Sequence, residues 1–226
     1  MKVLVACEES QVVTIELRKL GHEAFSCDIQ ECSGGHPEWH IQQDVLPLIN
    51  GNCQFVTCDG KKHIIDAEWD ILIAHPPCTY MSKAGARWMY PTAGNVSYQR
   101  LKKALEAKEF FMKFYNANCK RIAVENPVPL KIVDLPKPTQ VIQPYEYGHP
   151  YSKATCLWLK GLPKLKATNV IEKYTPYLPS NTGAFSRGGC GSRGIVHNAK
   201  DASKTFKGIA QAMVTQWTME VENEEI

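Results

Sequence analysis

The stretch KVLVACEESQVVTIELRKLGHEAFSCD, residues 2–28, contains a complete strand–helix–strand pattern. Its first part, residues 2–7, is a short apolar run of the kind that a parallel sheet buries on both faces. Residues 9–20 carry apolar side chains at helical spacing and end at Gly21, a residue typical of helix C-termini. Residues 23–28 then predict a second strand. Together these elements predict a parallel α/β sheet with a right-handed crossover.

A second unit of the same kind begins at residues 69–74, WDILIA, a predicted apolar strand that a Pro-Pro pair ends. Residues 97–117 predict the longest helix, with Ser97 as its N-cap. Its predicted buried face consists of Leu101, Ala104, Leu105, Phe111 and Phe114. Residues 121–125 predict another strand. The expected fold class is therefore α/β, with a Rossmann-like, doubly wound and mostly parallel sheet.

Weaker patterns fill the rest of the chain. The Asp59-Gly60 pair predicts a hairpin over residues 53–65, whereas residues 29–43 are loop-like. Residues 154–160 predict one more strand. The segment 176–208 is rich in Gly, Ser, Asn and Arg, which predicts a long loop. A final helix is predicted over residues 207–218, with Ile209, Met213, Val214 and Trp217 on a common face.

The composition predicts a soluble globular protein, because 44% of the 226 residues are hydrophobic and 22% are charged. No apolar run approaches the roughly 20 residues that span a bilayer, and the N-terminus does not resemble a secretory signal. Nine cysteines without such a signal favour free thiols in a reducing cytoplasm. No metal site is predicted: Cys32, His36 and His40 are spaced by four, but the chain has no Cys-x-x-Cys pair.

The charge is unevenly distributed along the chain. A net charge of +3 is too small to indicate nucleic-acid binding by itself. Between residues 186 and 207, however, Asp201 is the only carboxylate. The basic residues there are Arg187, Arg193, Lys200, Lys204 and Lys207. Residues 220–226 are acidic instead, which is typical of a solvated chain end.

Polar residues stand at the carboxyl ends of four predicted strands, where α/β sheets bind their ligands. These residues are Cys7, Glu8, Glu9, Ser10, Asp28, His75 to Cys78, Glu125 and Asn126. We expect them to form one cluster. This expectation follows from the strand pattern alone and marks the first functional signal.

The chemistry of single residues in this cluster has more than one interpretation. Cys78, held by two prolines, can be a nucleophile or an inert, buried thiol. Glu125 can be a general acid or a ligand of a pyrimidine edge, but taken alone it is more typical of an ordinary surface carboxylate at a strand end. Asp28 ends the second strand, where an acid often binds ribose hydroxyls. Asp44 can contact a cofactor base, cap a helix or form a turn.

Several motifs of the chain resemble those of the cytosine carbon-5 methyltransferases. DILIAHPPCTYMSKAG (residues 70–85) resembles the Pro-Cys nucleophile motif, and AVENP (residues 123–127) resembles the Glu-Asn-Val motif. YGHPYSKATCLWLKG (residues 147–161) resembles the turn before an arginine-rich strand, and GIAQAM (residues 208–213) resembles the C-terminal helix. Within the family, the chain is most similar to the short members that bacteriophages and prophages carry.

The resemblance implies an S-adenosylmethionine-dependent methyltransferase with Cys78 and Glu125 as catalytic residues. It implies a cofactor site formed by Ala6, Cys7, Glu8, Glu9, Ser10, Asp28, Ile29, Asp44, Val45, His75 and Pro76. The implied substrate-binding residues are Pro77, Ser82, Arg87, Asn126, Pro127, Lys153 and Thr155. The implied substrate is cytosine in DNA, flipped out of the stack. The implied location is the cytoplasm of a phage-infected or prophage-bearing bacterium.

The sequence also departs from the family at three places. The glycine-rich cofactor loop is replaced by Val5-Ala6-Cys7-Glu8-Glu9-Ser10. Lys153 and Thr155 stand where the family has two arginines. The target-recognition region shrinks to residues 165–206, between a catalytic core at 1–164 and a C-terminal helix with an acidic tail at 207–226. Two alternatives therefore stay open: the same chemistry on a free deoxycytidine nucleotide, or a degenerate homologue that only binds nucleic acid.

Overall fold

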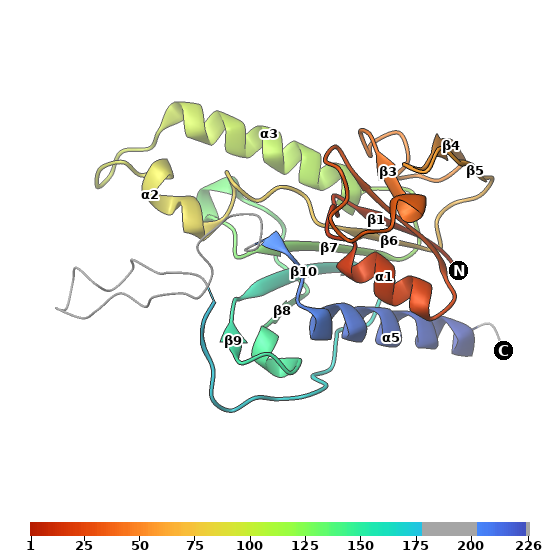
Figure 1. The fold of residues 1–226 in the computed structure, drawn as a ribbon. Coiled ribbons are helices and arrows are strands. Elements are labelled where there is room, and N and C mark those ends of the chain that lie inside the picture. Colours follow the sequence, from red (N-terminus) through yellow and green to blue (C-terminus); the bar gives the residue numbers. More distant parts are fainter. Residues whose placement is uncertain (178–202, 225–226) are drawn as a thin grey trace. The chain divides into compact units, whose positions relative to one another are not determined.

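The computed structural model describes residues 1–177 and 203–224 (Figure 1). The chain forms two compact units. One consists of Met1–Val141 with Thr155–Lys164, and the other of Ile142–Ala154 with Leu165–Ile226. Most of the predicted basic segment at 186–207 lies outside the described residues, as do Glu225 and the final residue of the predicted acidic tail. The predicted division into three regions, 1–164, 165–206 and 207–226, stays a prediction.

Among the described residues, seven strands form the central sheet in the order β3-β2-β1-β6-β7-β10-β8. They are β1 (Lys2–Ala6), β2 (Glu23–Asp28), β3 (His40–Gln42), β6 (Ile71–Ala74), β7 (Ile122–Pro127), β8 (Gln140–Ile142) and β10 (Thr155–Lys160). Numbered along the chain, these strands read 3-2-1-4-5-7-6, which begins with the doubly wound order of Rossmann-like sheets. The five strands from β3 to β7 pair in parallel, and β10 runs antiparallel to β7. The predicted fold class is confirmed.

The helices α1 (Val12–Lys19) and α3 (Tyr98–Tyr115) lie on opposite faces of this sheet, as two right-handed crossovers in opposite directions require (Figure 1). Ser97 caps α3 as predicted, because its side chain accepts a hydrogen bond from the Arg100 backbone N–H. Ala104, Phe111 and Phe114 are buried. The predicted burial of Leu105 is wrong: its side chain is 43% exposed. Successive residues of a helix are rotated by 100° about its axis, so Leu105 points away from the buried face on which Ala104 lies.

The remaining elements are short. They are the hairpin strands β4 (Cys53–Val56) and β5 (Lys62–Ile65), the pair β9 (Tyr151–Ser152) and β11 (Thr175–Pro176), and the helix α2 (Ala86–Met89). Single 3₁₀ turns stand at Pro37–Trp39, Lys83–Gly85, Lys131–Val133 and Pro144–Glu146. The predicted hairpin around Asp59-Gly60 is confirmed. The structure adds the strand β3 within residues 29–43, which are predicted as a loop. The sequence does not indicate this strand, because three residues are too few to show a periodic pattern.

In the second unit, α5 (Lys207–Glu224) confirms the predicted C-terminal helix and extends it. All four residues predicted on its common face are buried. The Gly208 N–H donates to Nε2 of His149 at 3.0 Å. A Cβ atom at this position would lie 2.0 Å from the carbonyl oxygen of Tyr147, so only glycine fits there.

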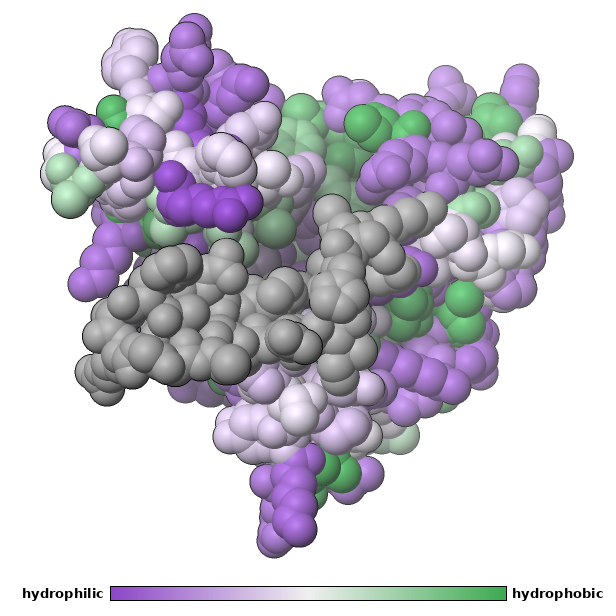
Figure 2. Space-filling model, turned by 60° about the vertical axis from the view of Figure 1, so that its left-hand side comes forward, coloured by the Kyte–Doolittle hydropathy of each residue, from purple (hydrophilic) through white to green (hydrophobic). Residues whose placement is uncertain are grey.

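The core of the first unit is aromatic and aliphatic. Phe111 of α3 meets Trp158 of β10 edge-to-face at 4.9 Å, and Trp69 donates its indole N–H to the Leu48 carbonyl at 2.6 Å. On the face shown in Figure 2, hydrophobic residues outside the grey atoms appear as separate patches among hydrophilic ones. Within residues 1–177 and 203–224, no helix is long and apolar enough to cross a membrane.

Candidate active site

The ends of β1, β6 and β7 meet at one edge of the sheet. Ala6 pairs with Ala74, and Ala74 pairs with Val124. The next residue of each strand or its following loop is Cys7, His75 or Glu125. Since parallel strands carry residues in register, the fold brings these three predicted site residues to neighbouring positions.

His75 and Glu125 contact each other directly. Nδ1 of His75 lies 3.0 Å from Oε2 of Glu125, and the two side chains are only 11% and 14% exposed. The positive charge of His75 also acts on Glu8, where it opposes the rise in pKa that burial causes. His75 thus contacts the carboxylate at one neighbouring strand end and acts electrostatically on the carboxylate that follows the other.

The Cys78 loop is anchored to β7. The side-chain amide of Asn126 donates to the Pro76 carbonyl at 2.8 Å, in a buried position. Cys78 follows two residues later, so its Cα lies within roughly 7 Å of that of Pro76. Its carbonyl accepts hydrogen bonds from the N–H groups of Met81 and Ser82, at 3.0 Å each. The Cys78 side chain is partly buried, as a thiol held in place yet open to a reactant should be.

The segment after Cys78 is held by basic side chains of α3. Arg100 donates through Nη2 to the Thr79 carbonyl at 2.7 Å. The guanidinium of Arg100 and the ammonium of Lys103 lie 5.0 and 5.3 Å from the centre of the Tyr80 ring. Ser82 is buried and bridges to Pro129. These contacts connect the loop after β6 to α3 and to the chain after β7.

The loop from β1 to α1 makes its turns without glycine. Cys7 has a φ of 59° and Gln11 a φ of 57°, both in the left-handed region. That conformation costs a non-glycine residue roughly 1–2 kcal/mol. In the family that the sequence resembles, the first glycine of the cofactor loop stands at the position of Cys7. The backbone of Cys7 has the left-handed conformation that favours glycine. Gln11 stabilises the turn, because its side-chain amide donates to the Ser26 hydroxyl and the His36 carbonyl.

Glu8 caps α1 from inside the protein. Its carboxylate accepts hydrogen bonds from the Val13 N–H at 2.6 Å, the Thr14 N–H at 3.3 Å and the Thr14 hydroxyl at 2.7 Å. The side chain is 4% exposed. Burial raises the pKa of Glu8, and these hydrogen bonds and the charge of His75 oppose the rise. The Glu8 carboxylate is therefore used by α1, and a contact with a cofactor would come from its backbone.

We expect Glu8→Ala to lower the free energy of unfolding by about 1–3 kcal/mol, since it leaves buried N–H groups of α1 without their acceptor. Urea unfolding measures this effect. Glu106→Ala, at an exposed position of α3, is the matched control and should change stability little. Equal stabilities of the two variants would contradict the capping role.

Asp28 and Asp44 lie around the same loop. Burial raises the pKa of the Cys7 thiol, and the negative charges of Asp28 and Asp44 raise it further. Each aspartate uses Oδ1 in a local turn, with the Gln30 N–H at 2.9 Å and the Leu46 N–H at 3.1 Å. The turn-forming interpretation of Asp44 is thus correct, and a cofactor role for it stays a prediction.

The other predicted site residues have varied surroundings. Val45 is buried in the core and Ile29 is 75% exposed. The Ser10 carbonyl lies so close to Gly34 that a Cβ there would be 2.7 Å away, and the Glu9 carbonyl accepts from the Ser33 N–H at 2.8 Å. The loop after β2 thus packs on the loop after β1.

The predicted substrate residues divide between the two units. Thr155 is buried and pairs with Pro127 across β10 and β7. Arg87 is exposed, with its guanidinium 4.6 Å from the centre of the Trp88 ring. Lys153 belongs to the second unit, where its Nζ lies 5.7 Å from the centre of the Phe206 ring. Its predicted role beside the substrate stays a prediction.

The sequence did not indicate the pairing of His75 with Glu125, because it placed His75 among the cofactor contacts. A signal was present, however. Each residue is the first polar side chain after an apolar strand, and two adjacent parallel strands in register place such residues side by side.

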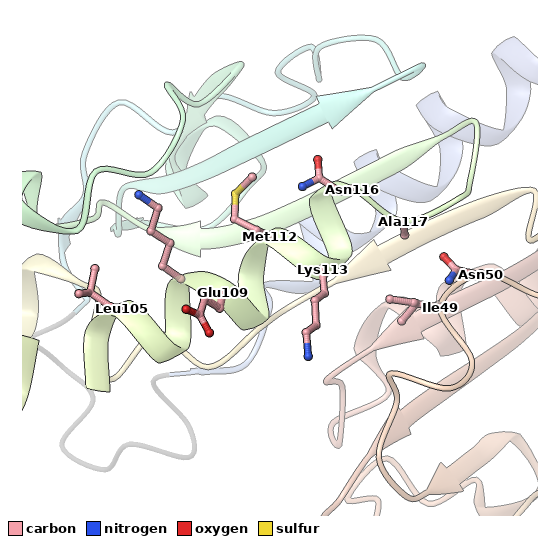
Figure 3. Close-up of a pocket in the computed structure, with 9 residues that line it drawn as sticks. Ile49, Asn50, Leu105, Glu109, Met112, Lys113, Asn116 and Ala117 are labelled. Atoms are coloured by element: carbon pink, nitrogen blue, oxygen red, sulfur yellow. The ribbon is translucent and has the colours of Figure 1, made fainter. Parts of the chain in front are cut away.

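A shallow groove on the first unit lies away from this cluster (Figure 3). It runs along α3 past Leu105, Glu109 and Met112 to Asn116, and Ile49 and Asn50 form its other side. The chain next to it leads into the amino end of β7, where the Asn118 N–H donates to Asn50 Oδ1 at 2.9 Å. Cys78 and Glu125 stand at the carboxyl ends of the strands, so the groove is not part of the candidate active site.

The cysteines and possible metal ligands are dispersed. In the part of the chain that the structure describes, every cysteine is a free thiol. Across those same residues, no three histidine, cysteine or acidic side chains are grouped so as to hold a metal ion.

Comparisons with known proteins give limited similarity. No protein-family model matches the chain, and no curated protein matches it. Among solved structures, it is similar to a protein from E. coli that is provisionally described as a DNA modification methyltransferase encoded within a prophage. The sequence identity is 14% and the TM-score is 0.40. The match covers 70% of this chain and 46% of that one, so the chain spans less than half of its length.

Proposed function

We propose that this protein transfers a methyl group from S-adenosylmethionine to carbon 5 of cytosine in DNA, through a covalent adduct on Cys78. The observation that carries the proposal is the placement of Cys78 and Glu125. The Asn126–Pro76 hydrogen bond joins the loop of one to the strand of the other. A cysteine and a glutamate so joined at the ligand-binding edge of a Rossmann-like sheet match the two catalytic groups of the family that the sequence resembles.

In the proposed reaction, Cys78 adds to carbon 6 of the pyrimidine and Glu125 protonates the ring nitrogen, so that carbon 5 becomes nucleophilic. S-adenosylmethionine, when bound, supplies an electrophilic methyl group. Loss of the carbon-5 proton then expels Cys78 as a thiolate. The anchored loop supports this mechanism, because a fixed nucleophile reacts without first ordering its backbone.

The helix cap by Glu8 supports a cofactor without phosphate groups. In Rossmann-like dinucleotide sites, the pyrophosphate binds the N–H groups at the start of the first helix. Here the Glu8 carboxylate already accepts from the Val13 and Thr14 N–H groups and would repel a second anion. S-adenosylmethionine has no phosphate, and its sulfonium and ammonium groups outweigh its one carboxylate, so this net cation suits a loop that carries the Glu8 carboxylate. Asp28, at the end of β2, would bind its ribose hydroxyls.

The segment after Cys78 favours a polynucleotide over a free nucleotide. Residues 71–105 contain no Asp or Glu. Their basic side chains are Lys83, Arg87, Arg100, Lys102 and Lys103. Trp88 is 58% exposed and Tyr98 is 79% exposed in the same segment. Exposed aromatic rings among cationic side chains are typical of surfaces on which bases stack beside phosphates.

We therefore expect Trp88→Ala to raise the Kd for a single-stranded oligonucleotide by about 5- to 100-fold, since stacking on one aromatic ring contributes about 1–3 kcal/mol. Fluorescence anisotropy with a labelled oligonucleotide measures the change. Ile64→Ala, which removes another exposed apolar side chain of the first unit, is the control. An unchanged Kd for the Trp88 variant would exclude this surface from DNA binding.

The function itself is tested with S-adenosylmethionine that carries a labelled methyl group. The purified protein is incubated with duplex DNA, single-stranded DNA, dCMP or dCTP. We expect label in DNA, and bisulfite sequencing should then show 5-methylcytosine. Label in the mononucleotides alone would instead establish the same chemistry on a free deoxycytidine nucleotide. Label in none of them would exclude both activities and favour a homologue that only binds.

A further inference from the structure

A role as a cofactor contact does not explain why His75 forms a hydrogen bond with Glu125. The residues are 50 positions apart, and the loop and the strand that carry them are also joined by the Asn126–Pro76 hydrogen bond. Both side chains are nearly buried and their polar atoms are 3.0 Å apart, so no water molecule separates them. Such pairs strengthen each other's charged forms and restrict each other's rotamers.

Other ionisable groups interact with each member of the pair. Glu8 faces His75 from the loop after β1. On the other side, Cys156 of β10 interacts electrostatically with Glu125. The pKa of the Cys156 thiol is raised to about 11, first by burial and further by the charge of Glu125, whereas the charge of Lys83 lowers it. Cys156 thus stays a neutral thiol near neutral pH. Histidine is the side-chain type whose charge normally changes between pH 5 and 8, so His75 is the member of this group suited to exchange a proton.

We propose that His75 is a positioning residue for Glu125, holding the carboxyl group through Nδ1 and returning to it the proton that it gives to the cytosine ring. This proposal rests on the proposed function. It assigns to His75 a role in proton supply that differs from the cofactor contact that the sequence suggested.

The proton is conserved in each step. At the start, Glu125 is a carboxylate that accepts a hydrogen bond from the His75 imidazolium. When Sγ of the Cys78 thiolate bonds to carbon 6, the displaced electron pair reaches ring nitrogen 3. His75 passes its Nδ1 proton to Glu125 and becomes neutral, and Glu125 gives the proton to nitrogen 3. When the carbon-5 proton leaves to water and the carbon–sulfur bond breaks, nitrogen 3 releases its proton. That proton returns to His75 through Glu125, and the site is restored.

Two variants of His75 distinguish its positioning of Glu125 from its supply of a proton. The side-chain N–H of His75→Asn can reach the place of Nδ1 but cannot be protonated, whereas His75→Ala loses both properties. We expect the wild type to lose kcat at alkaline pH as His75 loses its proton. His75→Asn should lower kcat by roughly 10²-fold, leave KM nearly unchanged and remove this alkaline decline. A His75→Asn enzyme with the wild-type pH profile would overturn the proposal.

An NMR titration of the His75 ring tests the pair without any activity. In Glu125→Gln, the midpoint of the His75 titration should move to lower pH, because the neighbouring negative charge is lost. An unchanged midpoint would overturn the proposal even if the enzyme methylates DNA. If the midpoint moves but no substrate is methylated, the pair is supported and the proposed function fails. Amide spectra of each variant verify that it is folded.

Discussion

Cys78→Ser is expected to abolish methyl transfer, with a fall of roughly 10⁴-fold or more, since a hydroxyl is a far weaker nucleophile than a thiolate. The two prolines before Cys78 and the hydrogen bond from Asn126 to Pro76 hold the backbone independently of the thiol. The substitution should therefore remove the nucleophile and leave the loop in place. Radiolabelled methyl transfer to DNA measures the loss of activity.

A trapping assay gives the same result without measuring turnover. DNA that contains 5-fluorocytosine should form a covalent complex with the wild type that survives a denaturing gel, because fluorine blocks the final elimination. Cys78→Ser should form none. Cys58→Ser, which alters an exposed thiol of the β4–β5 hairpin loop, should be trapped as well as the wild type. A Cys78→Ser protein that is trapped equally well would remove Cys78 from the mechanism.

Glu125→Gln is expected to lower kcat by roughly 10²- to 10⁴-fold, the usual contribution of a general acid. Glutamine keeps the length and one oxygen of the side chain, so it can still accept a hydrogen bond from His75. It cannot donate a proton to the ring nitrogen. Single-turnover methyl transfer isolates this step from product release.

Two controls separate catalysis from binding and folding. Calorimetric titration with S-adenosylmethionine should give a similar Kd for Glu125→Gln and the wild type, because Glu125 is not among the proposed cofactor residues. Glu109→Gln, at an exposed position of α3, should keep full activity. A Glu125→Gln enzyme with wild-type kcat would exclude Glu125 as the acid and leave the surface interpretation of this carboxylate.

Much of the fold was predictable because its signals are local. The apolar runs of β1, β2, β6 and β7 are short and are ended by polar or proline residues, and Ser97 caps α3 within four residues of sequence. Leu105 shows where a local pattern fails. Several apolar residues of a helix can form a stripe, and neighbouring elements decide which of them are covered.

The loop after β1 shows a different limit. Its sequence has none of the glycines that the family uses, yet Cys7 and Gln11 adopt left-handed backbone angles. Glu8 is a plausible cofactor ligand by position, and the structure uses its side chain as a helix cap instead. The left-handed angles do not follow from the local sequence, since Cys7 and Gln11 are held by contacts with β2 and its following loop. The cap joins residues five and six positions apart, but it requires the turn that these angles make.

By itself, the sequence determined the α/β class, the order of the elements along the chain and the set of polar residues that follow the strands. These properties depend on hydrophobic periodicity and on residues that begin or end helices and strands, which act over a few positions. Only the tertiary structure decided the strand order, the antiparallel direction of β10 and the pairing of His75 with Glu125. Those properties depend on which strands become neighbours and in which register, and this choice is made by packing among residues far apart in the chain.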